Sequence, residues 1–200
     1  MVNAPVLEVR DLHTQFVLRR GVVRAVDGVS FSLHAGEVLG LVGESGCGKS
    51  ITALSILQLL PRDSARIVQG QVMLNGEDLV EKSSREMREI RGRDIAMILQ
   101  DPQTSLNPVF TVGNQLREAI ARQSPGSKRS LTEKAVEVLR RVRLAAPEQR
   151  IGQFPHQMSG GMKQRVVGAI AISCEPQVMS ADEPMTALDV TRSEEHTSEL

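Results

Sequence analysis

One eight-residue segment constrains the fold of this chain more than any other feature: Gly43-Glu44-Ser45-Gly46-Cys47-Gly48-Lys49-Ser50. It fits the phosphate-loop pattern G-x-x-x-x-G-K-[ST], in which glycines let the backbone wrap so that successive N–H groups point at phosphates. Lys49 is expected to contact the β- and γ-phosphate oxygens, and Ser50 to offer its hydroxyl to Mg²⁺. The alternative is a glycine-rich turn without a ligand. We therefore expect a site for ATP or a closely related nucleoside triphosphate.

The sequence around this segment predicts the strand and the helix that a phosphate loop requires. Val38 to Val42 is a nearly continuous apolar run, which is typical of a strand buried on both faces. Ile51 to Leu60 carries leucines at helical spacing, and Pro61 is expected to end that helix. The order strand, glycine-rich turn, helix supports the phosphate-loop interpretation.

The rest of the chain predicts an α/β protein. Residues 5–42 alternate apolar runs with turn signals, so we expect short, mostly antiparallel strands there. Between Pro102 and Pro155 the pattern is that of helices and loops, with capping-box spacing at Ser130 and Glu133. The remaining predicted elements are a strand over Ile67–Leu74 with a turn at Asn75-Gly76, a short polar helix over 83–91, a buried strand over Ile95–Leu99, a helix over Gly160–Ser173 and a strand over Gln177–Ala181.

Composition narrows the possible functions. A chain of 200 residues with 40% apolar residues can bury the core of one domain. Its 24 basic and 24 acidic residues cancel, so charge gives no indication of a nucleic-acid partner. No apolar run approaches the roughly 18 residues that span a bilayer, and the N-terminus lacks the pattern of a secretory signal. We expect a cytoplasmic protein.

A second chemical feature is the pair Asp182-Glu183, which follows the predicted strand that ends at Ala181. In a phosphate-loop enzyme, Asp182 is expected to hold Mg²⁺ through its water shell, and Glu183 to polarise the attacking water. Alone, an apolar run that ends in two acids is equally typical of a solvated strand end. The phosphate loop favours the catalytic interpretation.

The segment Met158-Ser159-Gly160-Gly161-Met162-Lys163-Gln164-Arg165 resembles the signature motif of ABC-type ATPases, usually Leu-Ser-Gly-Gly-Gln. Asp182-Glu183-Pro184 and Thr186-Ala187-Leu188-Asp189 fit the same family, where Asp189 belongs to the D-loop. Ser159 and two glycines at a helix start leave N-terminal amides free for an anion. The resemblance implies that Ser159, Gly160 and Gly161 close on the γ-phosphate bound to a partner subunit. Without the other motifs, the segment is only a helix cap.

Two further residues are assigned by this resemblance. Gln100 matches the Q-loop glutamine, which senses Mg²⁺ and the attacking water while the following loop touches the membrane partner. Phe16 lies where the family places an aromatic residue that stacks on adenine, commonly Tyr. A packed core residue is the alternative for Phe16.

The resemblance also implies partners and a location. The contexts Gln100–Pro108 and Phe154–Met158 are similar to ATPases of bacterial dipeptide and oligopeptide importers. Such ATPases imply a second ABC ATPase subunit, identical or different, together with membrane permease subunits and, indirectly, an extracytoplasmic solute-binding protein. They also imply a peripheral position on the cytoplasmic face of the bacterial inner membrane, where ATP hydrolysis drives peptide uptake. No nucleic acid is expected to bind.

The implied fold is a P-loop NTPase of the ABC ATPase type, with a RecA-like core, an N-terminal antiparallel β region and an inserted helical subdomain at about 102–158. We assign residues 1–191 to this domain, which is expected to be C-terminally truncated and to lack the switch histidine. Residues 192–200 resemble a translated sequencing adapter and are expected to be a non-native tail. The alternatives are a soluble ABC-type ATPase of nucleic-acid or translation processes and an ATP-binding fragment without turnover.

Overall fold

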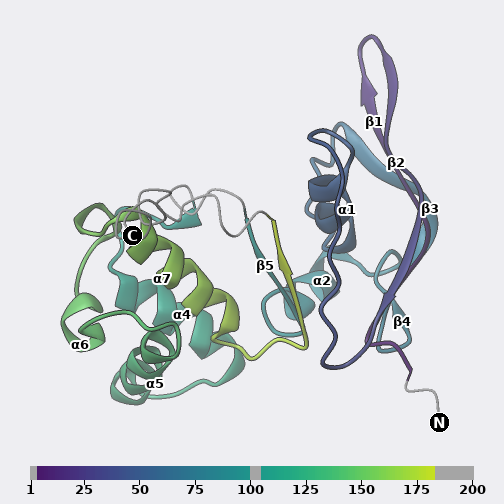
Figure 1. The fold of residues 1–200 in the computed structure, drawn as a ribbon. Helices are drawn as coiled ribbons and strands as arrows, with labels where there is room; N and C mark the ends of the chain where they lie inside the picture. The colour runs from purple at the N-terminus through teal and green to yellow at the C-terminus, as the bar shows by residue number, and fades with distance from the viewer. Residues whose placement is uncertain (1–3, 100–104, 183–200) are drawn as a thin grey trace, which may run out of the picture. The chain divides into compact units, whose positions relative to one another are not determined.

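The structure is a computed structural model of the 200-residue chain, and it describes residues 4–99 and 105–182. The chain divides into two compact units, one ending at Ile95 and the other beginning at Ala96. The first unit is built around an antiparallel sheet, and the second is mostly helical (Figure 1).

The sheet of the first unit has four strands in the spatial order β2-β1-β3-β4. They are β1 (Leu7–Leu18), β2 (Gly21–Leu33), β3 (Ala65–Leu74) and β4 (Glu77–Asp78), and neighbouring strands run antiparallel. Asn75 and Gly76 make the turn into β4, with φ of 50° and 85°. These left-handed values are the ones that an Asn-Gly hairpin turn requires. The predicted antiparallel strands and this turn are confirmed.

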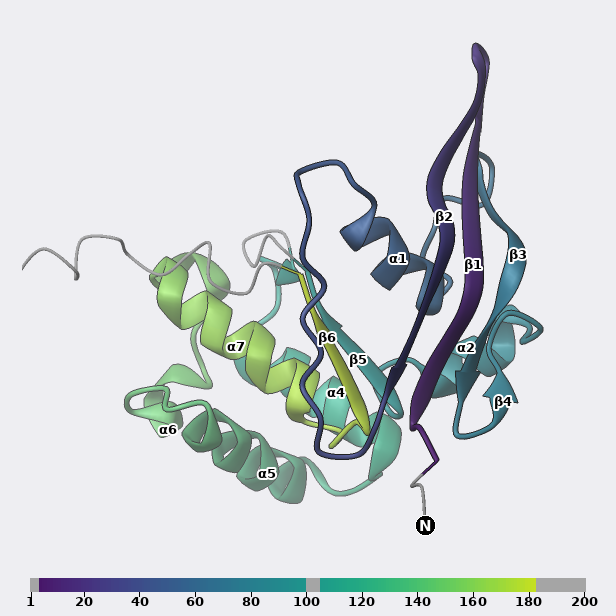
Figure 2. The same cartoon turned by 45° about the vertical axis from the view of Figure 1, so that its right-hand side comes forward.

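Helix α1 (Lys49–Ile56) follows the phosphate-loop segment and lies against the sheet on the side of β1 and β2 (Figure 2). Its buried contact with β1 is polar, because the hydroxyls of Ser55 and Thr14 lie 2.9 Å apart and share a hydrogen bond. Each buried hydroxyl thus has a partner and avoids the cost of burial without one.

Helix α1 is shorter than the predicted helix over 51–60, and its C-terminus explains the difference. Gln58 adopts a left-handed φ of 48°, which ends the helix. The guanidinium of Arg91 then donates hydrogen bonds to the carbonyls of Leu57 at 2.7 Å and Gln58 at 2.8 Å. These carbonyls therefore have hydrogen-bond donors without a further turn of helix.

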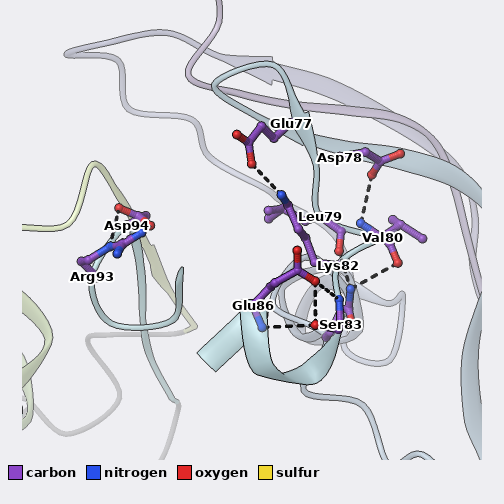
Figure 3. A network of polar contacts seen from close by, with 10 residues as sticks. Glu77, Asp78, Leu79, Val80, Lys82, Ser83, Glu86, Arg93 and Asp94 are labelled. Carbon is purple, nitrogen blue, oxygen red and sulfur yellow. Dashed lines mark hydrogen bonds and ion pairs between the residues drawn. The ribbon is translucent and has the colours of Figure 1, made fainter. Parts of the chain in front are cut away.

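Helix α2 (Ser84–Ile90) confirms the short polar helix predicted over 83–91. Figure 3 shows its capping box, in which Ser83 and Glu86 face each other at the helix start. The backbone N–H and the hydroxyl of Ser83 donate to the Glu86 carboxylate at 2.8 and 2.6 Å. These hydrogen bonds hold the pKa of Glu86 below its usual range. The side chain of Ser83 in turn accepts from the Glu86 N–H, so the start of α2 is closed by its own residues.

The expectation of a buried strand over Val38–Val42 is wrong for the described structure. This segment forms no strand, and Val38 and Val42 are 97% and 94% exposed. A strand needs neighbours for its backbone N–H and C=O groups, and no strand of the described residues pairs with this segment. The apolar sequence of this segment predicted a buried strand. Among the described residues, no neighbouring strand pairs with the segment and buries it.

The second unit combines a two-stranded sheet with helices. Strand β5 (Ile95–Ile98) begins at the boundary between the units and pairs with β6 (Val178–Ala181), so both predicted strands are confirmed. The helical elements are α4 (Val112–Gln123), α5 (Lys128–Arg141), α6 (Pro147–Arg150), the 3-10 helix η1 (Pro155–Gln157) and α7 (Gly160–Ile172). Among the described residues, no helix meets the length and hydropathy that a membrane-spanning helix requires.

The core of the second unit lies between α4, α5 and α7. Leu116 and Leu139 are fully buried there, together with Val166. Helix α5 starts earlier than predicted, because Ser127 and not Ser130 is its N-cap. The Ser127 hydroxyl accepts a hydrogen bond from the Ser130 N–H at 3.2 Å. The earlier cap lengthens the helix by a turn and so adds backbone hydrogen bonds.

Candidate functional site

The phosphate-loop segment depends on glycine at two positions with left-handed backbone. Gly46 and Gly48 have φ of 82° and 98°, values that other residues adopt only with strain. Gly48 also lies directly against β2, since a Cβ on it would be 2.3 Å from the Ala25 carbonyl oxygen. No side chain fits in this contact. The end of the loop is therefore held on the backbone of the sheet.

The Lys49 side chain turns back over the loop that precedes it. Its ammonium donates hydrogen bonds to the carbonyls of Gly43 at 2.8 Å and Glu44 at 2.7 Å, and it lies 3.7 Å from the sulfur of the exposed Cys47. A positive charge is thus fixed beside the curved backbone from Gly43 to Gly48. Carbonyl oxygens are weaker partners for an ammonium than ionised phosphate oxygens.

The N-terminus of α1 has no cap from the chain. Gly48 occupies the N-cap position and offers no side chain, and no acidic residue lies in the first turn. The N–H groups of this turn therefore point outward with the positive end of the helix dipole behind them. Such an end binds anions readily. The half-buried Ser50 lies in the same turn, where its hydroxyl is a hard oxygen donor suited to Mg²⁺.

Phe16 lies in the same unit as this loop, on β1, and is half-buried. It faces the same side of β1 as Thr14, whose hydroxyl contacts α1. Its direct partner in β2 is the exposed Val23. Val26 pairs with Thr14, and its side chain also lies at the Gly48 contact. Paired residues face the same side of a sheet, so a short apolar strip of Val26, Val23 and Phe16 leads from Gly48 toward the turn between β1 and β2.

The contributions of Val26 and Val23 to this strip were not predicted from the sequence. Both depend on the pairing of β1 with β2 and on the contact with Gly48. A search for apolar residues opposite Phe16 in the expected hairpin would have found Val23, whereas nothing in the sequence indicates the register shift that places Val26 opposite Thr14.

Asp182 and the predicted signature segment lie in the second unit. Asp182 directly follows β6, is partly exposed, and its N–H donates to the Ile98 carbonyl at 3.0 Å. Its carboxylate is a second hard oxygen donor of the kind that Mg²⁺ prefers. Gln100, Glu183 and Asp189 lie outside the described residues.

Ser159 is the N-cap of α7, and its hydroxyl accepts from the Met162 N–H at 3.4 Å. Nothing in the described part of the chain requires glycine at the next two positions, Gly160 and Gly161. Neither Gly160 nor Gly161 has a positive φ, and a Cβ on either would meet no atom within 4 Å. The start of α7 thus presents open backbone that an external group can approach closely.

Comparison with known proteins identifies related chains. The profile of a protein family described as ABC transporter matches residues 26–186. The chain is 56% identical over 185 residues to a probable peptide ABC transporter ATP-binding protein, y4tR, of Sinorhizobium fredii, covering 92% of this chain and 55% of the relative. It is 51% identical over 186 residues to the dipeptide transport ATP-binding protein DppD of Bacillus subtilis, covering 93% and 56%. The chain thus spans about half the length of these relatives.

Solved structures show the same fold. The dimeric structure of a post-hydrolysis state of the ATP-binding cassette MJ0796, bound to ADP and Pi, superposes with a TM-score of 0.81 at 25% identity, covering 94% of this chain and 78% of that one. A second dimeric structure of MJ0796, described as a bacterial ABC transporter cassette, matches equally well.

The contact of Gly48 with β2 can be tested by substitution. Gly48→Ala is expected to lower the free energy of unfolding by roughly 3 kcal/mol, from about 1–2 kcal/mol for a left-handed side chain and about 1–3 kcal/mol for crowding. Gly46→Ala, where a Cβ meets nothing within 4 Å, is expected to lose only the conformational part. Urea unfolding followed by circular dichroism measures both. Equal stability of the two variants would contradict the close contact.

Proposed function

The chain belongs to the ABC transporter family, and from this membership we propose that it is an ATP-binding and ATP-hydrolysing subunit of a bacterial peptide importer. The observation that carries the proposal is the uncapped start of α1, with the Lys49 ammonium fixed beside the loop that leads into it. The names of the relatives, which refer to peptide and dipeptide transport, support the importer assignment.

Triphosphate binding follows from the chemistry of the loop. The loop N–H groups and the start of α1 donate to phosphate oxygens, and Lys49 exchanges its two carbonyl partners for the β- and γ-phosphates. Oxygen atoms of Ser50, Gln100 and Asp182 form the proposed donor set for Mg²⁺. Bound Mg²⁺ would neutralise negative charge on the phosphates.

The base lies, in this proposal, along the strip that begins at the Gly48 contact. Phe16 offers an aromatic face for stacking, and Val23 beside it adds apolar contact. Phe16 is only half-buried, so part of its ring is available to a ligand. This availability favours the adenine-stacking role over the alternative of a packed core residue.

Hydrolysis requires a base and a second subunit. We assign the base to Glu183, which polarises the attacking water, and a D-loop contact to Asp189. The second subunit contributes Ser159, Gly160 and Gly161 at the start of its α7. The support for this role is that neither the conformation nor the internal packing of α7 requires glycine, so the glycines leave room for an external group.

The proposed location is the cytoplasmic face of the bacterial inner membrane, where the dimer binds permease subunits and acts indirectly with an extracytoplasmic solute-binding protein. Support comes from the relatives, one of which is named a dipeptide transport ATP-binding protein and another a probable peptide ABC transporter ATP-binding protein. Peptides are therefore the proposed cargo of the assembled transporter.

Removal of the Lys49 ammonium tests triphosphate binding. Lys49→Ala is expected to weaken ATP binding at least tenfold, because a hydrogen bond to a charged group contributes about 1.5–3 kcal/mol. Lys134→Ala, on the exposed face of α5, is the matched control and should bind ATP like the parent. Isothermal titration with Mg²⁺ present measures both affinities. Unchanged ATP affinity of Lys49→Ala would refute the phosphate-loop assignment.

A side chain at the start of α7 tests the shared site. Gly161→Val is expected to bind ATP with the affinity of the parent but to lose ATP-dependent dimer formation, because the side chain fills the space proposed for the partner's nucleotide. Val is no worse than Gly in a helix, so the helix itself is not weakened. Gly168→Val, later in the same helix and also with open space at its Cβ, is the control.

Sedimentation velocity with and without ATP distinguishes the two states of assembly. A Gly161→Val variant that dimerises with ATP as the parent does would exclude the proposed role of this segment.

A further inference from the structure

The buried residues of strand β1 change from odd-numbered to even-numbered positions partway along its length. The buried positions are odd-numbered up to Val9 and even-numbered from Leu12 to Thr14. Two residues of β1 lie between Val9 and Leu12, whereas only one residue of β2 lies between their partners, Phe31 and Val29. Strand β1 therefore contains one extra residue here, a β-bulge. Because side chains alternate with a period of two, one extra residue turns the rest of a strand over. Phe16 therefore faces α1 only because of this bulge.

The extra residue is Asp11, which the surrounding strands hold in an unusual conformation. Its φ is 46°, in the left-handed region, and its N–H donates to the Ser30 hydroxyl of β2 at 2.8 Å. On the other side, Gly70 of β3 has a φ of 98°, and a Cβ on it would lie 2.3 Å from the Asp11 carbonyl oxygen. The bulge thus lies between β2 and β3 and is in close contact with both.

The side chain of His13 joins β1 to β2 at this bulge, and the side chain of Asp11 joins β1 to β3. Its Nε2 lies 3.0 Å from an Asp11 carboxylate oxygen, and its Nδ1 lies 2.9 Å from an Asp27 carboxylate oxygen in β2. The Gln69 amide of β3 donates to the second Asp11 oxygen at 2.6 Å. Ionised carboxylates only accept, so His13 makes both hydrogen bonds at once when both ring nitrogens carry protons.

These hydrogen bonds stabilise the charged form of the bulge carboxylate. The contact with His13, followed by that with Gln69, lowers the pKa of Asp11. The His13 ring is only 22% exposed, although both carboxylates that it contacts are 57% exposed. The imidazole is therefore largely enclosed within a polar clamp that we define as Asp11, His13, Asp27 and Gln69.

Two contacts of β1 and β2 with the phosphate-loop region lie between the clamp and the turn that joins these strands. Beyond it on β1 come Thr14, bonded to Ser55 of α1, and then Phe16. Beside it on β2 comes Ala25, against which Gly48 lies. Without the extra residue, Gln15 would take the place of Phe16 on the face toward α1.

We propose that His13 is a positioning residue for nucleobase binding. Its hydrogen bonds stabilise the bulge, and the bulge keeps Phe16 on the side of β1 that faces α1 and the phosphate loop. This inference rests on the proposed binding of ATP with its base beside Phe16. It extends that proposal to a side chain that does not touch the nucleotide.

The test separates base binding from phosphate binding with two probes, Mg·ATP and inorganic tripolyphosphate with Mg²⁺, in isothermal titrations of the whole chain. His13→Ala is expected to bind ATP roughly tenfold more weakly, the effect of losing a base stack, and tripolyphosphate within twofold of the parent. His34→Ala is the matched control, because His34 also contacts a carboxylate, Glu37 at 3.2 Å, but lies at a turn after β2. It should bind both probes as the parent does.

A second variant tests the connection to the aromatic ring. Phe16→Ala is expected to show the same selective loss of ATP affinity, and the double variant His13→Ala, Phe16→Ala should bind no more weakly than Phe16→Ala alone. Additive losses would overturn the proposal. So would an unchanged ratio of ATP to tripolyphosphate affinity in His13→Ala, or loss of both ligands together. If the parent itself binds neither probe, the proposed function fails; if it binds both and only the ratio is unaffected, this inference alone fails.

Discussion

The proposed nucleotide site depends on the close approach of two backbones, at Gly48 and Ala25. The loop carries no side chain at this contact, so its curvature is fixed against a strand of the sheet and not against a movable group. That position brings the uncapped start of α1 next to β2. It also aligns the loop with the strip that leads to Val23 and Phe16. The proposed phosphate and base sites therefore lie in the same unit.

The bulge in β1 completes this arrangement from the other side. A sheet with a regular register would bury alternate residues throughout, and Phe16 would face away from α1. Asp11 and His13 thus determine a feature of the site from a position several residues away. The groups to which we assign turnover lie in the second unit or beyond the described residues.

Local signals in the sequence predicted much of this structure. The glycines and Lys49 of the phosphate loop, the Asn75-Gly76 turn and the helix that begins after Ser159 depend on the residues that form them. Predictions from the sequence failed where the structure depends on residues far away in the chain. The burial of Val38–Val42 depends on neighbouring strands, and the start of α5 on competition between two serines. The His13 clamp joins three strands by contacts that no local pattern indicates.

Hydrogen–deuterium exchange with and without Mg·ATP tests whether the amides at the start of α1 bind phosphate. We expect slower exchange for the backbone amides from Gly46 to Ile51 when ATP is present. We expect no change at the start of α2, where Ser83 and Glu86 already close the helix. Unchanged exchange at Gly46 to Ile51 under saturating ATP would show that these amides do not bind phosphate.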